Sequence, residues 1–218
     1  MAPAHAHHTS LSEPPIFLLA TTNPGKVQEL LPILSQAPCR WVTLADLGIT
    51  TEVKETGHTC AENAILKART YCQMTGLPTL ADDSGLEVDA LGGEPGARAK
   101  VYAGENATDP QRIAFLLQKL QGVPWERRTA RFRSVIALAF PDGRVYAVEG
   151  TLEGIIALAP HGTGGFGYDP VFYLPDRGKT VAQLSLEEKN AISHRGQAAR
   201  RAVALLQKIL ASAHPQED

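Results

Sequence analysis

The sequence predicts a mixed α/β fold, and three observations lead to this fold class. A short apolar segment, Ile16 to Ala20, is followed directly by residues that start a helix. Further on, residue pairs typical of capping boxes precede apolar segments. Residues 130–152 instead alternate between two faces around the turn Pro141-Asp142-Gly143, as in a long antiparallel hairpin. We therefore expect strands and helices within one sheet-based domain without internal repeats.

The first strand and the first helix meet at Asn23. Ile16 to Ala20 is consistent with a buried strand, and Asn23 with Pro24 then provides an N-cap and a first-turn proline. Pro32 should kink or shorten the helix that follows. The apolar positions of this helix are Val27, Leu30, Leu31 and Leu34.

Capping residues predict two more helices. Thr59 and Glu62 form a capping-box pattern, and Gly76 stands where a C-terminal glycine belongs. Asp109 with Pro110 opens the next helix. The apolar positions are Ala61, Ala64, Ile65, Ala68 and Cys72 in one helix, and Ile113, Leu116, Leu117 and Leu120 in the other.

The last part of the chain begins with strands and ends with helices. Gly154 to Ala159 and Pro170 to Leu174 are expected to form strands beyond the hairpin. Ser185 with Glu188 gives another capping box. Arg195 to Ala211 is predicted to form a long terminal helix.

Length and composition are those of a soluble globular protein. The chain has 218 residues, of which 44% are hydrophobic and 20% charged, and this composition argues against wholesale disorder. The net charge of −2 lacks the basic excess of a duplex-binding domain. The longest apolar runs are far shorter than the roughly 18 residues that span a bilayer. We therefore expect neither a nucleic-acid partner nor a membrane anchor.

The ends of the chain and its cysteines indicate boundaries and compartment. Residues 1–15 and 212–218 are expected to be loose tails, and residues 16–211 one domain in one or two lobes. No cationic segment with an apolar stretch marks a secretory signal, so the cytoplasm is the expected location. Three cysteines without a C-x-x-C pair are expected to be buried free thiols; they are Cys39, Cys60 and Cys72.

The segment between the first strand and helix is a candidate phosphate-binding loop. Backbone N–H groups at a helix N-terminus attract phosphate, and a lysine adds a full charge. The glycine spacing of a Walker A loop is absent. The alternative is a plain strand-to-helix turn capped by Asn23 and Pro24. The residues concerned are Thr21, Thr22, Asn23, Pro24, Gly25 and Lys26.

A second candidate is the acidic pair Asp82-Asp83, followed by Ser84 at the expected end of a strand. Adjacent strand residues point to opposite faces, so only one carboxylate should reach a given site. Mg²⁺ is commonly held by one or two carboxylates together with substrate phosphates, and Glu55 could complete such a site. The alternative is a solvated turn with an ordinary surface glutamate nearby.

A glycine-rich loop spans residues 162–169 and matches G-x-G-x-x-G in spacing. A dinucleotide-binding loop opens a helix, whereas residues 168–172 here are expected to continue as extended chain, so we reject that interpretation. With Phe166 and Asp169, the loop could stack on a flat base and accept hydrogen bonds from its edge. Simple tight-turn chemistry is the alternative.

The junction between the last two helices carries Lys189, His194 and Arg195. The arginine could hold a phosphate or a purine carbonyl, and the histidine could donate a hydrogen bond. A capped helix start with solvated charges is the alternative. Together, the four segments provide the groups that a nucleoside triphosphate with Mg²⁺ requires.

With these motifs in this order, the chain resembles the inosine triphosphate pyrophosphatase family, whose members hydrolyse dITP, ITP and XTP. The resemblance runs from about Ile16 to about Leu210. The motifs are TTNPGK at 21–26, ETG at 55–57, AENAILKA at 61–68, ADDSGLEVDALGG at 81–93, GTGGFGYDPVF at 162–172 and SLEEKNAISHRGQA at 185–198.

The resemblance implies an elongated, two-lobed α/β domain in which helices flank a long mixed β-sheet around a central active-site cleft, usually in a homodimer. It also implies Mg²⁺-dependent cleavage that releases a nucleoside monophosphate and pyrophosphate. Residues 21–26 and Ser84 would bind substrate, Glu55 and Asp83 would bind Mg²⁺, and Asp83 would accept the proton of the attacking water. The remaining expected substrate contacts are the base-binding residues Phe166, Gly167, Tyr168 and Asp169, with Phe166 stacking, and the phosphate or 6-oxo contacts Lys189, His194 and Arg195.

One segment departs from the family pattern Pro-Gly-x-x-Ser-Ala-Arg-Tyr. Ala99 stands where the serine is usual and Val101 where the arginine is usual, so Arg98 or Lys100 could supply the charge from a shifted position. Two alternative functions are a nucleotide-binding regulator without turnover and a phosphatase that releases orthophosphate.

Overall fold

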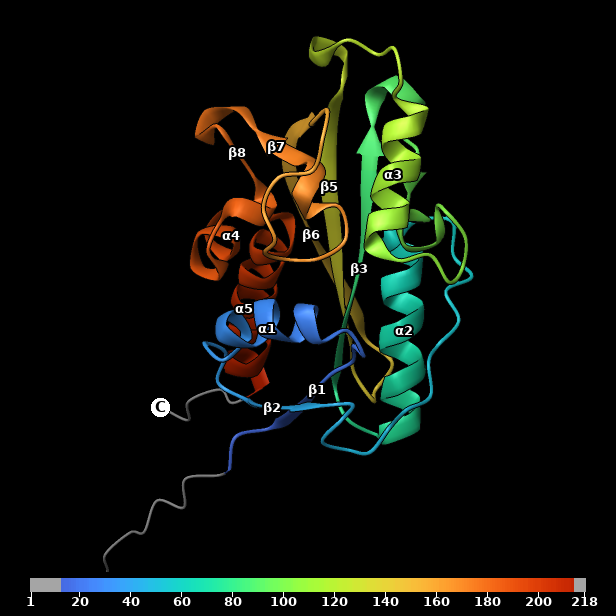
Figure 1. Cartoon of the computed structure of the whole chain (residues 1–218). Coiled ribbons are helices and arrows are strands. Elements are labelled where there is room, and N and C mark those ends of the chain that lie inside the picture. Colours follow the sequence, from blue (N-terminus) through green and yellow to red (C-terminus); the bar gives the residue numbers. More distant parts are fainter. Residues whose placement is uncertain (1–12, 214–218) are drawn as a thin grey trace, which may run out of the picture.

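The computed structural model describes residues 13–213, and its strands form one mixed sheet. Its order is β2 (Arg40–Thr43), β1 (Ile16–Leu19), β3 (Thr79–Val88), β5 (Thr129–Ala139), β6 (Val145–Ile156), β7 (Phe172–Leu174) and β8 (Lys179–Thr180), while β4 (Pro95–Gly96) pairs with β3. β1 is parallel to β2 and β3, and the other pairs are antiparallel. The expected mixed α/β fold is confirmed (Figure 1).

Helices flank the sheet on both sides (Figure 1). α1 (Pro24–Leu34) packs against α5 (His194–Ala213), which covers β5 and β6, and α4 (Leu186–Ile192) precedes α5. α2 (Cys60–Thr75) covers β3 and β5 from the other side, and α3 (Asp109–Lys119) lies beyond its end. Short 3₁₀ turns occupy Asp89–Leu91, Ala99–Val101, Trp125–Arg127, Asp169–Val171, Pro175–Arg177 and Val181–Gln183.

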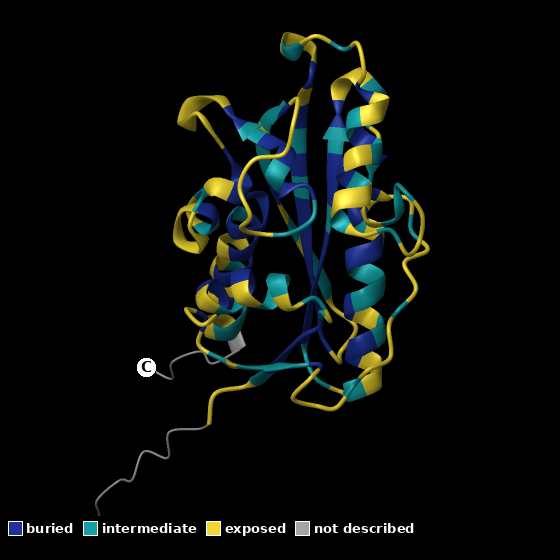
Figure 2. Cartoon of the chain, in the orientation of Figure 1, coloured by how far each residue is buried: buried dark blue, intermediate teal, exposed yellow. Residues whose placement is uncertain are grey.

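The apolar side chains form separate clusters along the length of the sheet. One lies between the sheet and α1 with α5, around Phe17 and Ile136, and another lies under α2 around Ala64 and Val135. A third surrounds Phe172 at the other end of the molecule. Figure 2 shows the central strands buried along most of their length. Each fully buried large apolar side chain stabilises the fold by about 1.5 to 3 kcal/mol.

The predicted caps are present. The Asn23 side chain accepts hydrogen bonds from the N–H groups of Gly25 and Lys26, and both capping-box bonds between Thr59 and Glu62 form. Pro32 was expected to kink or shorten this helix, and α1 ends two residues after it, at Leu34. Pro32 lies in the last turn of α1, where the loss of its N–H affects only the end of the hydrogen-bond ladder.

Four expectations about elements are wrong. The acidic pair lies in the middle of β3, not at a strand end, because β3 pairs with β5 over all ten of its residues. The separate strand expected at 154–159 is the end of β6. The extended chain expected at 168–172 contains a 3₁₀ turn at Asp169–Val171, and the terminal helix continues to Ala213, past the predicted start of the tail.

The cysteines are free thiols, and two are buried as expected. Cys60 and Cys72 are buried, whereas Cys39 is half-buried. Burial raises the pKa of the Cys39 thiol to about 11 and that of Cys60 to about 12, so both stay protonated at neutral pH. Across the described residues, no helix has the length and apolar character needed to cross a membrane. Residues 1–12 and 214–218 lie outside the described part, and with them most of both predicted tails.

Candidate active site

The site begins at a free edge of β3. On this edge β1 pairs with β3 only at Thr79 and Leu80, and β4 pairs with it only at Leu86 and Glu87. Between these points, residues 81–85 pair with β5 on one side and have no strand on the other side among the residues described. The segment Ala81-Asp82-Asp83-Ser84-Gly85 therefore faces a gap in the sheet. The chain that leaves the end of β1 borders the same gap.

A cleft of about 1160 Å³ surrounds this edge. Its walls include the segment after β1, the loop 52–58, one side of α2, the segment 97–101 and the glycine-rich loop. Most of the expected site residues line it, namely Thr21, Thr22, Asn23, Pro24, Lys26, Glu55, Asp83, Ser84, Phe166, Gly167, Tyr168, Asp169, His194 and Arg195. Gly25 and Lys189 are not among the lining residues, so the chain brings together 14 of the 16 expected residues at one cleft.

Two carboxylates in the cleft share one ammonium group. The Nζ of Lys67 lies 2.6 Å from Oε1 of Glu55 and 3.4 Å from Oδ1 of Asp83. Nδ2 of Asn63 donates to Oδ2 of Asp83 at 3.2 Å. Burial raises the pKa of Asp83 above its ordinary value, although Lys67 acts in the opposite direction. A buried carboxylate of raised proton affinity, held by two side chains of α2, is suited to accept a proton.

This pair of carboxylates fits a magnesium ion delivered with a phosphate ligand. No group of three or more metal-ligating side chains occurs among residues 13–213. Mg²⁺ does not require such a group, since it commonly uses one or two carboxylates, water and substrate phosphates. Glu55 and Asp83 already converge on one cation, so the donor set and its charge match that requirement.

Three cations and three carboxylates form a buried ion network, of which Lys26, Asp169 and Arg195 line the cleft. Lys26 lies 2.9 Å from Asp82, and Arg195 contacts both Asp82 (3.2 Å) and Glu29 (2.5 Å). Lys189 completes the network with Glu29 at 2.6 Å and with Asp169. The basic residues predicted to bind phosphate are thus paired with carboxylates of α1, β3 and the glycine-rich loop.

Burial and partners determine the charge states within this network. Burial opposes ionisation of Asp82, but Lys26 and Arg195 outweigh it and hold its pKa well below the ordinary value. Burial raises the pKa of Asp169 in spite of Lys189. Asp82 and Asp83 therefore differ in proton affinity although they are adjacent, because successive strand residues face opposite sides of β3. Asp82 faces α1 and α5, and Asp83 faces α2.

The aromatic ring of Phe166 lies over the phosphate-loop candidate. A Cβ on Gly25 would lie 2.6 Å from the Phe166 ring, so only glycine permits this approach. The ring also covers two cations, with Lys189 Nζ 4.8 Å and the Arg195 guanidinium 5.3 Å from its centre. Its backbone N–H donates to Asp169 at 2.9 Å. The glycine-rich loop and the first turn of α1 are therefore in direct contact.

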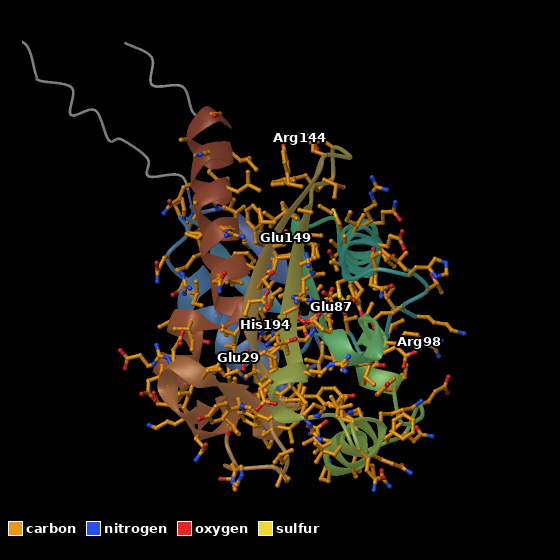
Figure 3. All side chains as sticks on the ribbon, turned by 90° about the horizontal axis from the view of Figure 1, so that it is seen from above. Glu29, Glu87, Arg98, Arg144, Glu149 and His194 are labelled. Carbon is orange, nitrogen blue, oxygen red and sulfur yellow. The ribbon has the colours of Figure 1, made fainter. Side chains whose placement is uncertain are left out.

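His194 occupies the start of α5 and lines the cleft. Its ring stacks on Phe132 at 4.7 Å between centres, and Figure 3 shows it in the middle of the molecule. Burial, together with Arg195 and Lys189, lowers the pKa of His194 well below its ordinary value. The imidazole is therefore neutral at physiological pH, and its buried Nδ1 has no hydrogen-bond partner within the described chain.

The structure shows the helix cap that was the alternative interpretation of the phosphate-loop candidate. The N–H groups of Gly25 and Lys26 are occupied by the Asn23 cap, as in a plain helix start. Thr22 donates to Glu52 at 3.3 Å, which joins this turn to the loop that carries Glu55. Thr21 and Thr22 line the cleft, so their side chains are available at its surface.

Sequence reasoning missed several residues that hold the site together. Lys67 and Asn63 were part of a recognised motif without an assigned role, although their spacing of four residues places both on one face of α2. Glu29 of α1 is buried because it pairs with Lys189 and Arg195, which lie far away in the sequence. Asp109 was expected only to start a helix, but its carboxylate also accepts from the N–H of Gly167 at 2.7 Å. Contacts between distant segments cannot be read from spacing.

Comparison with known proteins agrees with this arrangement. The sequence model of the Ham1 family matches residues 17–205. A dITP/XTP pyrophosphatase of Geobacter sulfurreducens is 50% identical over 193 residues, which cover 88% of this chain and 95% of that protein. A dITP/XTP pyrophosphatase of Thermus thermophilus is 54% identical over 185 residues, covering 84% and 87%.

Solved structures show the same fold. A HAM1 protein from Coxiella burnetii superposes with a TM-score of 0.81 at 41% identity, covering 89% of this chain and 99% of that one. A nucleoside-triphosphatase / dITP/XTP pyrophosphatase from Mycobacterium abscessus superposes with a TM-score of 0.67 at 39% identity, covering 92% and 100%. From the extent of these matches, the chain belongs to the Ham1 family.

Proposed function

We propose that this protein hydrolyses the noncanonical purine nucleoside triphosphates dITP, ITP and XTP to the monophosphate and pyrophosphate, and so removes them from the nucleotide pool. The observation that carries the proposal is the meeting of Glu55, Lys67 and Asp83 at one cleft with the aromatic glycine-rich loop. The relatives named dITP/XTP pyrophosphatase support the substrate class.

The side chains have distinct roles in this proposal. Asp83, of raised pKa and held by Asn63, orients the attacking water and accepts its proton. Lys26 and Arg195 stabilise the negative charge that develops on the departing pyrophosphate. Ser84 contacts the substrate and receives a hydrogen bond from Arg195 at 3.1 Å, which keeps its hydroxyl at the cleft.

The base is selected by the other end of the cleft. Phe166 stacks on the purine, and the loop residues Gly167, Tyr168 and Asp169 hold its edge. Lys189 and His194 approach the phosphate or the 6-oxo group. Donors that match a 6-oxo group are left unpaired by a 6-amino group, which discriminates against adenine.

The cofactor in this proposal is Mg²⁺, held by Glu55 and Asp83. When bound, it neutralises triphosphate charge and polarises a phosphoryl oxygen. We further propose that the protein acts in the cytoplasm as a homodimer, with neither nucleic acid nor membrane as a partner. Excess EDTA is expected to abolish turnover, and restored Mg²⁺ to recover it; unchanged turnover in EDTA would contradict the metal requirement.

One assay separates this function from the alternatives. Purified protein is incubated with ITP, and with ATP and GTP as controls, and the phosphorus products are identified. Pyrophosphate with a preference for ITP is the expected outcome. Orthophosphate as the first product would indicate a phosphatase, and binding without any product would indicate a regulator.

A further inference from the structure

The glycine-rich loop is anchored to α3, a helix that carries none of the residues assigned to catalysis. The carboxylate of Asp109, the first residue of α3, accepts a hydrogen bond from the backbone N–H of Gly167 at 2.7 Å. The two residues are 58 positions apart in the sequence, and Figure 1 shows the loop reaching across to the start of α3. Both residues line the cleft. A side chain of α3 thus holds the loop that carries Phe166.

Carboxylates hold two successive N–H groups of this loop. The N–H of Phe166 donates to Asp169 at 2.9 Å, within the loop itself, and the N–H of Gly167 donates to Asp109. Gly167 has a φ of +62°, in the left-handed region that favours glycine, and a Cβ at this position would have no atom within 4 Å. Because no neighbour packs on this side of Gly167, the hydrogen bond to Asp109 fixes the backbone that follows Phe166.

The carboxylate of Asp109 is itself held in place. Its other oxygen accepts from the guanidinium of Arg112, three positions further along α3. The same guanidinium donates to the carbonyl of Lys100 at 2.9 Å and to the carbonyl of Ala107. Each carboxylate oxygen therefore has its own donor, and the side chain cannot turn away from Gly167 without losing a charge-assisted hydrogen bond as well.

We propose that Asp109 is a positioning residue that sets the place of Phe166 and thereby controls recognition of the purine base. This assignment rests on the proposed function for the stacking role of Phe166 and for the identity of the substrate. Stacking requires the ring to be held at the right distance and angle, so a loop that is free to move loses that contribution. Lys26 and Arg195, which are assigned to the phosphates, belong to other segments and have their own carboxylate partners. Asp109 should therefore affect recognition of the base and not of the phosphates.

The test compares Asp109→Ala with wild type in the full chain. We expect KM for ITP to rise about 3- to 10-fold, the effect of losing one hydrogen bond, with a smaller change in kcat. The preference for ITP over ATP should fall, because the loop that follows Phe166 holds the edge of the base. The dissociation constant of inorganic tripolyphosphate, measured by calorimetry, should stay at the wild-type value, since this probe has no base.

Amide hydrogen exchange, measured residue by residue by NMR, checks the contact without any substrate. In Asp109→Ala the N–H of Gly167 should exchange about 10-fold faster than in wild type, because it has lost its acceptor. The N–H of Phe166 keeps Asp169 as its acceptor, so its exchange should change less. Wild-type exchange at Gly167 in this variant would contradict the anchoring by Asp109.

Glu105→Ala is the matched control, because it removes an exposed carboxylate from the wall of the same cleft that has no hydrogen-bond partner between residues 13 and 213. An unchanged KM for ITP in Asp109→Ala, or an equal rise in Glu105→Ala, would overturn the role of Asp109. Equal weakening of ITP and tripolyphosphate binding would overturn it too. Thermal unfolding verifies that both variants are folded. Failure of wild type to release pyrophosphate from ITP would contradict the proposed function alone, since exchange at Gly167 needs no turnover.

Discussion

Asp82 and Asp83 differ by one position and have opposite electrostatic surroundings. Asp82 faces Lys26 and Arg195 on the side of α1 and α5, and these cations keep it ionised. Asp83 faces Lys67 and Asn63 of α2, and burial raises its pKa. The pleat of β3 thus separates a carboxylate that stabilises cations from one suited to accept a proton.

Asp83→Asn is expected to lower kcat for ITP about 10²- to 10⁴-fold, the usual contribution of a general base, while KM changes much less. The reason is that the amide keeps the shape but cannot take the proton. Steady-state kinetics measure both constants. Asp142→Asn, at the exposed turn of the hairpin, is the control, and a near-normal kcat in Asp83→Asn would reject the assignment.

Phe166→Ala is expected to raise KM for ITP or to reduce the preference for ITP over ATP. The ring supplies the flat surface for the base, and base–aromatic stacking contributes about 1 to 3 kcal/mol. Phe166→Tyr keeps the ring and serves as the control. If the alanine variant matches wild type in both measurements, Phe166 does not stack on the base.

Glu29→Gln is expected to reduce the free energy of unfolding by about 3 to 5 kcal/mol, because an uncompensated buried charge is costly. The change leaves Lys189 and Arg195 buried with one counter-charge fewer. Urea unfolding provides the measurement. The control is Glu153→Gln, which removes an exposed partner of Arg131, so a change in the free energy of unfolding below about 1 kcal/mol is expected. Equal losses in the two variants would show that burial of the Glu29 network does not increase its contribution to stability.

Helix α2 contributes both to the apolar core and to the candidate active site. Its apolar residues pack under the sheet, and its polar residues Asn63 and Lys67 reach Asp83. Both polar residues lie within the first half of the helix, which begins at the Thr59 capping box. A well-formed first turn of α2 therefore holds Asn63, one of the two groups that position Asp83.

Thr59→Ala is expected to destabilise the protein by about 1 kcal/mol, because the N–H of Glu62 loses its acceptor. Thr59→Ser keeps the hydroxyl and should stay close to wild type. Chemical unfolding of the three proteins checks this order. Indistinguishable stability of Thr59→Ala and Thr59→Ser would show that the cap contributes nothing.

Across the whole molecule, the near-zero net charge conceals buried charges of both signs. His194 lies among these charges, and its pKa is lowered mainly by burial. Below about pH 6.5, an unfolded histidine binds a proton that the folded protein does not accept. Stability therefore falls as the pH decreases through this region, and is fully present above it.

His194→Gln should weaken this pH dependence, by up to about 1.4 kcal/mol per pH unit below about pH 6.5. Urea unfolding at several pH values between about 5 and about 8 measures the slope. His58→Gln changes an exposed histidine and is the control. If the slope is the same in all three proteins, protonation of His194 does not limit stability.

Local signals predicted much of the fold. The caps at Asn23, Thr59 and Ser185 and the hairpin at 130–152 lie where the sequence placed them, because each depends on residues a few positions apart. The depth of Asp83 within β3 was not predictable, because it depends on pairing with Val135, 52 positions further on. The same applies to the contact of Phe166 with Gly25.

The sequence by itself determined the α/β class, the order of the motifs and the types of side chain that gather at the cleft. Only the tertiary structure decided how their charges are paired. It placed Glu55 and Asp83 on Lys67, and Lys26 and Arg195 on Asp82, because a free edge of β3 lies between two helical layers. Periodicity specifies which face of an element a residue occupies, whereas the partner across the gap depends on how the elements pack.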